Sequence, residues 1–104
     1  MEAMSHKLKR TRGSGNIFAD LGFPPEEAQN LKMRSDLLMA IERACRRRGL
    51  TQAQAARRLG ITPPRLNALL KGRIGLFSLD ALVNIASRAG LNVRLVIRGA
   101  QPRA

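Results

Sequence analysis

Apolar residues recur at helical spacing through the first half of the chain. Between Pro24 and Arg48 they follow steps of three and four, and the set comprises Ala28, Leu31, Leu37, Leu38, Ile41, Ala44 and Cys45. Proline and two acids favour a helix start at Pro24, whereas three arginines followed by Gly49 are typical of a helix end. The pattern predicts one long helix, in which Ser35-Asp36 is a candidate break.

Three shorter helices follow, each with a hydroxyl residue before it and a glycine near its end. A Ser or Thr side chain at the N-cap accepts a hydrogen bond from the first turn, and glycine tolerates the backbone turn that ends a helix. The predicted helices are Gln52 to Leu59 after Thr51, Pro63 to Lys71 after Thr62, and Leu79 to Ala89 after Ser78.

After Gly90 the period of the pattern changes from helical to two. In residues 91–98 every second position is apolar, and this apolar face comprises Leu91, Val93, Leu95 and Ile97. The positions between them are Asn92, Arg94, Val96 and Arg98. This is the single predicted strand, so its backbone groups need a partner edge. The simplest partner is the same strand of a second copy, which predicts a homodimer. Residues 16–23 of the same chain, or a strand from another protein, are the alternatives.

The N-terminal region divides at Gly15. Residues 1–15 carry Lys7, Lys9, Arg10 and Arg12 beside Gly13-Ser14-Gly15, a composition typical of a flexible arm. We favour an inert tail slightly over an arm that adds phosphate contacts. Residues 16–104 form the predicted domain. Within it, the apolar segment Asn16 to Phe23 is equally interpretable as a strap packed on the domain or as a contact point for another protein.

Composition narrows the class of protein. A chain of 104 residues with 44% hydrophobic positions has room for one globular domain. Aromatic residues make up only 3%, which disfavours stacking on single-stranded nucleic acid. The chain has one cysteine, Cys45, which excludes an internal disulfide framework and a Cys-rich zinc site. A catalytic triad or zinc site that uses histidine would depend on the single His6 in the N-terminal arm. Cys45 is assigned to the core.

We therefore expect no enzyme activity, no cofactor and no metal, since no carboxylate pair, Ser/His set or phosphate loop is present. No apolar run is long enough for a membrane span, and no apolar signal segment is seen, so we expect a cytoplasmic protein.

Charge identifies the class of partner. The formal net charge is +12, from 19 basic and 7 acidic residues. Nine of the basic residues lie between Arg43 and Arg73, where no acid occurs. A solvated helix face does not require such a window, so contact with a polyanion is the favoured interpretation.

The helices at 52–59 and 63–71 have the pattern of a helix-turn-helix. Gly60-Ile61-Thr62 supplies the turn, and Ala56 is small enough for a close helix crossing. A shared apolar seam is available from Ala55, Leu59, Ile61, Leu66 and Leu69.

The stretch Leu50 to Thr62 resembles the Cro/C1 (XRE-type) phage-repressor helix-turn-helix family. A narrower resemblance, to HigA-type antitoxins, is carried by segments 15–22, 31–37 and 77–84 and covers residues 15–98. The resemblance implies an all-α bundle of four to five helices and a double-stranded-DNA-binding repressor. It also implies a RelE-like toxin as a partner. The alternatives are a toxin-neutralising module with secondary DNA binding and a stand-alone phage-type repressor. A third alternative, an RNA-associated basic protein, explains the positive charge but not the helix-turn-helix pattern.

The resemblance also implies that the helix after Thr62 enters the major groove. On a helical wheel Leu66, Leu69 and Leu70 face the core, so the outward face reads bases. The predicted base-reading residues are Arg65, Asn67, Ala68 and Lys71, with guanine, adenine and a thymine methyl assigned to the first three in that order. The predicted phosphate contacts are Gln52, Arg57, Arg58, Thr62 and Arg73. Pro63-Pro64 stands where family members usually have polar readers, so we expect specificity to rest on fewer side chains or on DNA shape.

Overall fold

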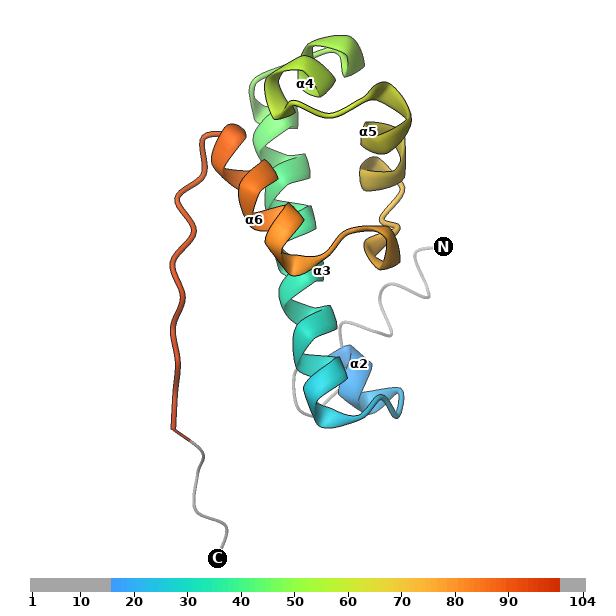
Figure 1. Cartoon of the computed structure of the whole chain (residues 1–104), viewed down its shortest axis with the longest axis vertical. Coiled ribbons are helices and arrows are strands. Elements are labelled where there is room, and N and C mark those ends of the chain that lie inside the picture. The colour runs from blue at the N-terminus through green and yellow to red at the C-terminus, as the bar shows by residue number, and fades with distance from the viewer. Residues whose placement is uncertain (1–15, 100–104) are drawn as a thin grey trace, which may run out of the picture.

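The computed structural model describes residues 16–99, and this part of the chain is all-helical (Figure 1). It contains five α-helices and one short 3-10 helix, in the order α2 (Ile17–Asp20), α3 (Pro25–Arg47), α4 (Gln52–Leu59), α5 (Pro63–Leu70), η1 (Ile74–Leu76) and α6 (Leu79–Arg88). The predicted all-α class is confirmed, and the four predicted helices correspond to α3, α4, α5 and α6. The basic arm at 1–15 lies outside the described residues.

Helix α3 is the central element of the bundle. Its 23 residues make it about 35 Å long at the usual rise per residue. The helix is continuous, so the candidate break at Ser35-Asp36 is wrong. The Lys32 ammonium lies 2.9 Å from a carboxylate oxygen of Asp36, one turn further on, and this pair bridges the suspected break on the solvent side.

The core forms where α4, α5 and α6 pack around the second half of α3. Its largest fully buried side chains are Ile41, Leu59, Leu66, Leu69, Phe77 and Leu82. Burial of each stabilises the fold by about 1.5–3 kcal/mol before entropy is subtracted. The predicted seam is confirmed: Ile61 is half-buried and its other members are buried. The placement of Leu70 in the core is wrong, because its side chain is 39% exposed.

Residues 16–23 contain the short helix α2, which sequence periodicity does not predict. Asn16 caps it, because its side-chain oxygen accepts a hydrogen bond from the Phe18 amide at 2.9 Å. The Asn16 amide group also donates to the Ala28 carbonyl oxygen at 3.1 Å, which ties the segment to α3. The segment is therefore attached to α3, as the strap interpretation expects, while a contact point for another protein stays a prediction. A helix presents no sheet edge, so this segment is not the strand partner considered for residues 91–98.

The C-terminal segment leaves the bundle after Gly90 as an extended chain (Figure 1). Leu91 packs against the core, but beyond it Leu95, Val96 and Ile97 are 77%, 64% and 83% exposed. The expected strand is not formed within the described chain, because helices offer no edge for its backbone groups to pair with. Pairing with a second copy stays a prediction.

Candidate nucleic-acid interface

Helices α4 and α5 are held in a helix-turn-helix arrangement by their caps and their turn. The Thr51 hydroxyl accepts from the Gln54 amide at 3.1 Å, and the Gln54 side chain accepts from the Thr51 amide at 2.9 Å, forming a capping box. Thr62 caps α5 by accepting from the Arg65 amide at 3.3 Å. Gly60 has φ +69°, a left-handed conformation that glycine adopts without the steric cost of a Cβ. The sequence therefore fixes both helix starts and the corner between them.

One face of α5 is free of other elements and carries most of the predicted reading residues. Asn67 and Lys71 are exposed, and Ala68 is half-buried. Together with Pro64, Arg73 and Leu76 these residues line a shallow hollow of about 210 Å³. The structure thus brings together four predicted DNA contacts: Asn67, Ala68, Lys71 and Arg73.

The hollow combines donors, positive charge and an apolar contact. The Asn67 amide is the group that best recognises adenine, while Lys71 and Arg73 suit phosphate oxygens. Leu76 is 58% exposed and lies beside them, a residue that sequence analysis missed. It sits in η1, where no periodic pattern marks an outward side chain. Its methyl groups match the thymine methyl that lines the major groove.

Arg65 lies differently from the other predicted reading residues. Its guanidinium carbon is 4.3 Å from the centroid of the Phe77 ring, and its Nη1 donates to the Leu76 carbonyl oxygen at 3.3 Å. It is half-buried and does not line the hollow. The structure therefore packs Arg65 against η1 instead of placing it beside Asn67.

Arg34 holds the same loop from the inside. Its Nη1 donates to the carbonyl oxygens of Ile74 and Phe77, both at 3.1 Å, and its Nε donates to the Asn30 side-chain oxygen at 2.7 Å. Sequence analysis assigned it no role. A signal was present, since Arg34 occupies a position on the apolar stripe that runs from Leu31 to Leu38, where a cation needs internal acceptors.

The remaining predicted phosphate contacts lie on α4 or at the start of α5. Gln52 is exposed at the start of α4, and the exposed Thr62 uses its hydroxyl as the α5 cap. Arg57 and Arg58 are exposed near the end of α4. Arg58 reaches toward Gly90, its Nη2 lying 3.7 Å from where a Cβ on that glycine would be. It therefore belongs to the α6 side of the bundle, not to the α5 hollow.

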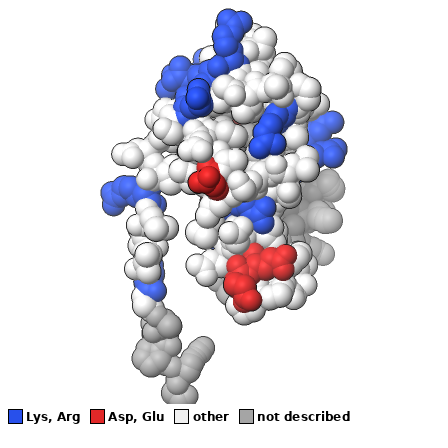
Figure 2. All heavy atoms as spheres, viewed as in Figure 1, with Lys and Arg blue, Asp and Glu red and all other residues white. Residues whose placement is uncertain are grey.

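Charge is unevenly distributed over the described residues. Figure 2 shows the cations of the visible face concentrated over the end of the molecule where α4 lies, and the largest acidic patch near α2. The described residues contain two ion pairs, Lys32–Asp36 and Arg46–Glu42. The cations from Arg47 to Arg73 accordingly have no carboxylate partner in the part of the chain that the structure describes.

The buried Cys45 thiol lies under this positive end. Burial raises the pKa of the Cys45 thiol, and the nearby Arg58 and Arg48 charges partly oppose that rise. A desolvated, protonated thiol is a poor nucleophile, which fits the predicted core role. Among residues 16–99, no cluster of His, Cys, Asp and Glu suits a metal ion, and no helix has the length and apolar character needed to cross a membrane.

Comparison with known proteins agrees with this geometry. A search among curated proteins found no match to the chain. A family profile described as "Helix-turn-helix domain" matches residues 17–98, which includes every described helix and most of the extended segment. The protein belongs to the helix-turn-helix domain family, whose fold is that of a DNA-binding regulator.

Proposed function

We propose that the protein is a sequence-specific transcriptional repressor that binds double-stranded DNA as a homodimer. The observation that carries this proposal is the hollow on α5, which gathers Asn67, Lys71 and Arg73 on a face with no carboxylate among its lining residues. Exposed donors and cations on the second helix of such a motif are placed to meet base edges and phosphates together.

In the proposed complex α5 lies in the major groove. Asn67 pairs with an adenine, Ala68 and Leu76 contact thymine methyl groups, and Lys71 and Arg73 bind the backbone. Gln52 and the free amides at the start of α4 contact a neighbouring phosphate. Pro63 and Pro64 occupy the first turn of α5 and donate no hydrogen bond, so few side chains carry specificity.

The extended segment supports the proposed homodimer. The backbone groups of residues 92–98 form no backbone hydrogen bond within the described chain, and the side chains of Val93, Leu95 and Ile97 are exposed. Antiparallel pairing with the same segment of a second copy satisfies the backbone and buries the apolar side chains. A two-fold dimer then predicts a palindromic operator with half-sites about one helical turn, roughly 34–36 Å, apart.

Selection of binding sites from random duplexes tests the proposal. We expect a palindromic consensus for the wild type. Asn67→Ala relaxes preference at one base pair per half-site, at a cost of about 1–3 kcal/mol. Lys71→Gln serves as the control for charge, because it weakens all sequences and leaves the consensus intact if the lysine contacts the backbone. Recovery of no consensus from the wild type contradicts the proposal.

The opposite end of the molecule supports a second role, that of an antitoxin which represses its own operon. Leu21 and Phe23 are 65% and 39% exposed beside α2, an apolar surface separate from the α5 hollow. A RelE-like toxin is the proposed partner there. Co-purification from the native host tests this role, with Leu21→Asp as the variant that loses the partner. If no protein accompanies the wild type, the stand-alone repressor is the surviving interpretation.

A further inference from the structure

Three helices end at the same place on the α6 side of the bundle. Gly60 follows α4, and Arg88 at the end of α6 lies against it, its Nη1 2.8 Å from where a Cβ would be. Gly90 follows α6, and Arg48 at the end of α3 lies against it at the same distance. Both glycines have positive φ, so each corner exposes backbone on which a guanidinium can lie.

The glycine contacts bring together Arg48, Arg58 and Arg88, and Arg47 precedes Arg48 at the end of α3. We call these four exposed cations the arginine cluster: Arg47, Arg48, Arg58 and Arg88. Two of them, Arg48 and Arg58, lie against the same Gly90 turn. No carboxylate of the described chain forms an ion pair with any of the four. Within the described domain, therefore, no opposite charge neutralises the cluster.

The helix ends explain how the cluster assembles without being neutralised. Each C-terminus carries about half a negative charge, so three of them offset about one and a half of the four positive charges. An excess of about two and a half positive charges remains at the surface. The helix ends thus position the guanidinium groups and leave charge available for a ligand.

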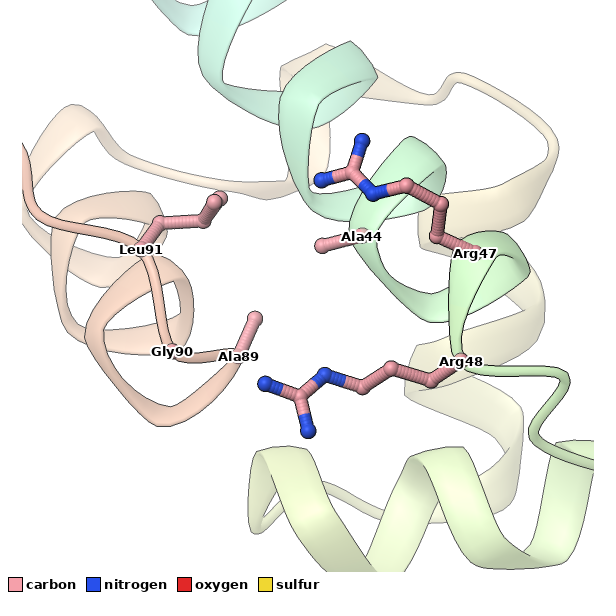
Figure 3. Close-up of a pocket in the computed structure, with 6 residues that line it drawn as sticks. All are labelled: Ala44, Arg47, Arg48, Ala89, Gly90 and Leu91. Atoms are coloured by element: carbon pink, nitrogen blue, oxygen red, sulfur yellow. The ribbon is translucent and has the colours of Figure 1, made fainter.

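Two members of the arginine cluster, Arg47 and Arg48, line a hollow. A cavity of about 330 Å³ lies between the ends of α3 and α6, lined by Arg47, Arg48, Gly90 and Leu91, with Ala44 and Ala89 as small apolar neighbours (Figure 3). In Figure 3 the side chains of Arg47 and Arg48 extend from α3 toward α6 around this space. Small residues between two planar guanidinium groups leave room for a compact anion that both can contact.

We infer that the arginine cluster is a second anion site, specific for phosphate groups and separate from the α5 hollow. Guanidinium forks match phosphate oxygens two by two, which a single ammonium cannot do. A DNA backbone and a free phosphate share this chemistry. Figure 1 places α5 and α6 on different sides of α3, so the cluster does not depend on the reading face. The inference extends the proposed function, because backbone contact at the cluster adds affinity without adding sequence preference.

The decisive variant is Arg48→Gln/Arg58→Gln, and its matched control is Arg94→Gln/Arg98→Gln on the extended segment, with the same change of charge and comparable exposure. The first measurement is binding to a random-sequence duplex over a range of salt concentrations. We expect the salt slope of the cluster variant to fall by about 0.9 for each phosphate group that it no longer neutralises. We expect the consensus to remain unchanged. An unchanged slope relative to the control overturns DNA backbone as the ligand.

The second measurement uses inorganic phosphate alone, followed through the amide NMR signals of Gly90 and Leu91. We expect saturable shifts with phosphate but not with chloride at equal ionic strength, and their loss in Arg48→Gln/Arg58→Gln. Shifts with inorganic phosphate but an unchanged DNA slope assign the site to a small phosphorylated ligand. Equal shifts with a poly-glutamate peptide overturn phosphate specificity, and no shift with any probe together with an unchanged DNA slope overturns the site.

Failure of the proposed reading face can be distinguished from failure of the arginine cluster as a phosphate site. If Lys71→Gln/Arg73→Gln binds every duplex as the wild type does and keeps its consensus, the proposed reading face is wrong. The phosphate titration at Gly90 does not depend on that face, so it tests the arginine cluster in either case.

Discussion

Arg34 donates a hydrogen bond of 3.1 Å to the carbonyl oxygen of Phe77, a residue 43 positions later in the chain. The ring of Phe77 is buried and supports the guanidinium of Arg65 on its face. The loop that follows the reading helix is therefore held between two arginines, one from α3 and one from α5. The position of Leu76 and Arg73 beside α5 depends on this loop.

Replacement of Arg34 tests how much the loop depends on it. We expect Arg34→Gln to lower the free energy of unfolding by about 1–3 kcal/mol, because two backbone carbonyls are left without their charged donor. Denaturant unfolding measures this decrease. Lys32→Gln is the control, since its exposed pair with Asp36 contributes only about 0.5 kcal/mol or less. Equal effects of the two substitutions contradict the role assigned to Arg34.

Arg65 distinguishes base reading from packing. Its contacts with Phe77 and the Leu76 carbonyl favour packing, so we expect Arg65→Ala to reduce stability by about 0.5–2 kcal/mol. We then expect the affinity for every DNA sequence to fall by the same factor, because the loop beside the hollow is less firmly held. Site selection with the variant checks this outcome. A loss confined to one guanine position instead supports the base-reading role predicted from the sequence.

Two neighbouring residues of the extended segment test the proposed dimer. Ile97 lies on the predicted pairing face and Val96 on the other, although both are well exposed in the single chain. We expect Ile97→Glu to dissociate the dimer and Val96→Glu to leave it largely intact, because only the first places a charge in the buried face. Sedimentation equilibrium measures the mass. Identical masses for the two variants contradict pairing in this register.

Ionisation of the Cys45 thiol makes the stability of the protein fall at alkaline pH. Burial raises the pKa of the Cys45 thiol above its usual 9.0, so the folded state holds this proton more tightly than the unfolded state. The resulting stability is fully present below that value and is lost as pH rises through the folded-state pKa. We expect Cys45→Ala to remove this contribution, which shows as a shallower fall in melting temperature above pH 9. If the melting temperatures of wild type and variant depend on pH in the same way, Cys45 makes no such contribution.

The predictions that succeeded depended on local chemistry. Thr51 with Gln54, and Thr62 with its first turn, fix helix starts through contacts within four residues, and Gly60 fixes a corner by its own conformation. The core seam also follows from spacing, because burial of one helix face is a property of the pattern.

The predictions that were wrong or missing concern residues whose contacts lie far away in the sequence or on another chain. Leu70 has helical spacing for the core, but it lines an open hollow beside α3 and α4 and its side chain stays 39% exposed. Arg34 finds its acceptors about forty residues away, and helix α2 depends on its contact with α3. Residues 91–98 have the alternation of a strand, yet a strand exists only when another chain segment pairs with it.

The distribution of charge along α3 has one more consequence. The first turn of α3 carries Glu26 and Glu27 and its last turn carries Arg46 and Arg47, so these charges are separated by about 35 Å. This separation of charge gives the domain a permanent electric dipole moment. In the field of a duplex this moment turns the molecule cationic end first before any contact forms, so a larger share of encounters is productive. We expect the gain in association rate to vanish as added salt shortens the Debye length below the length of α3.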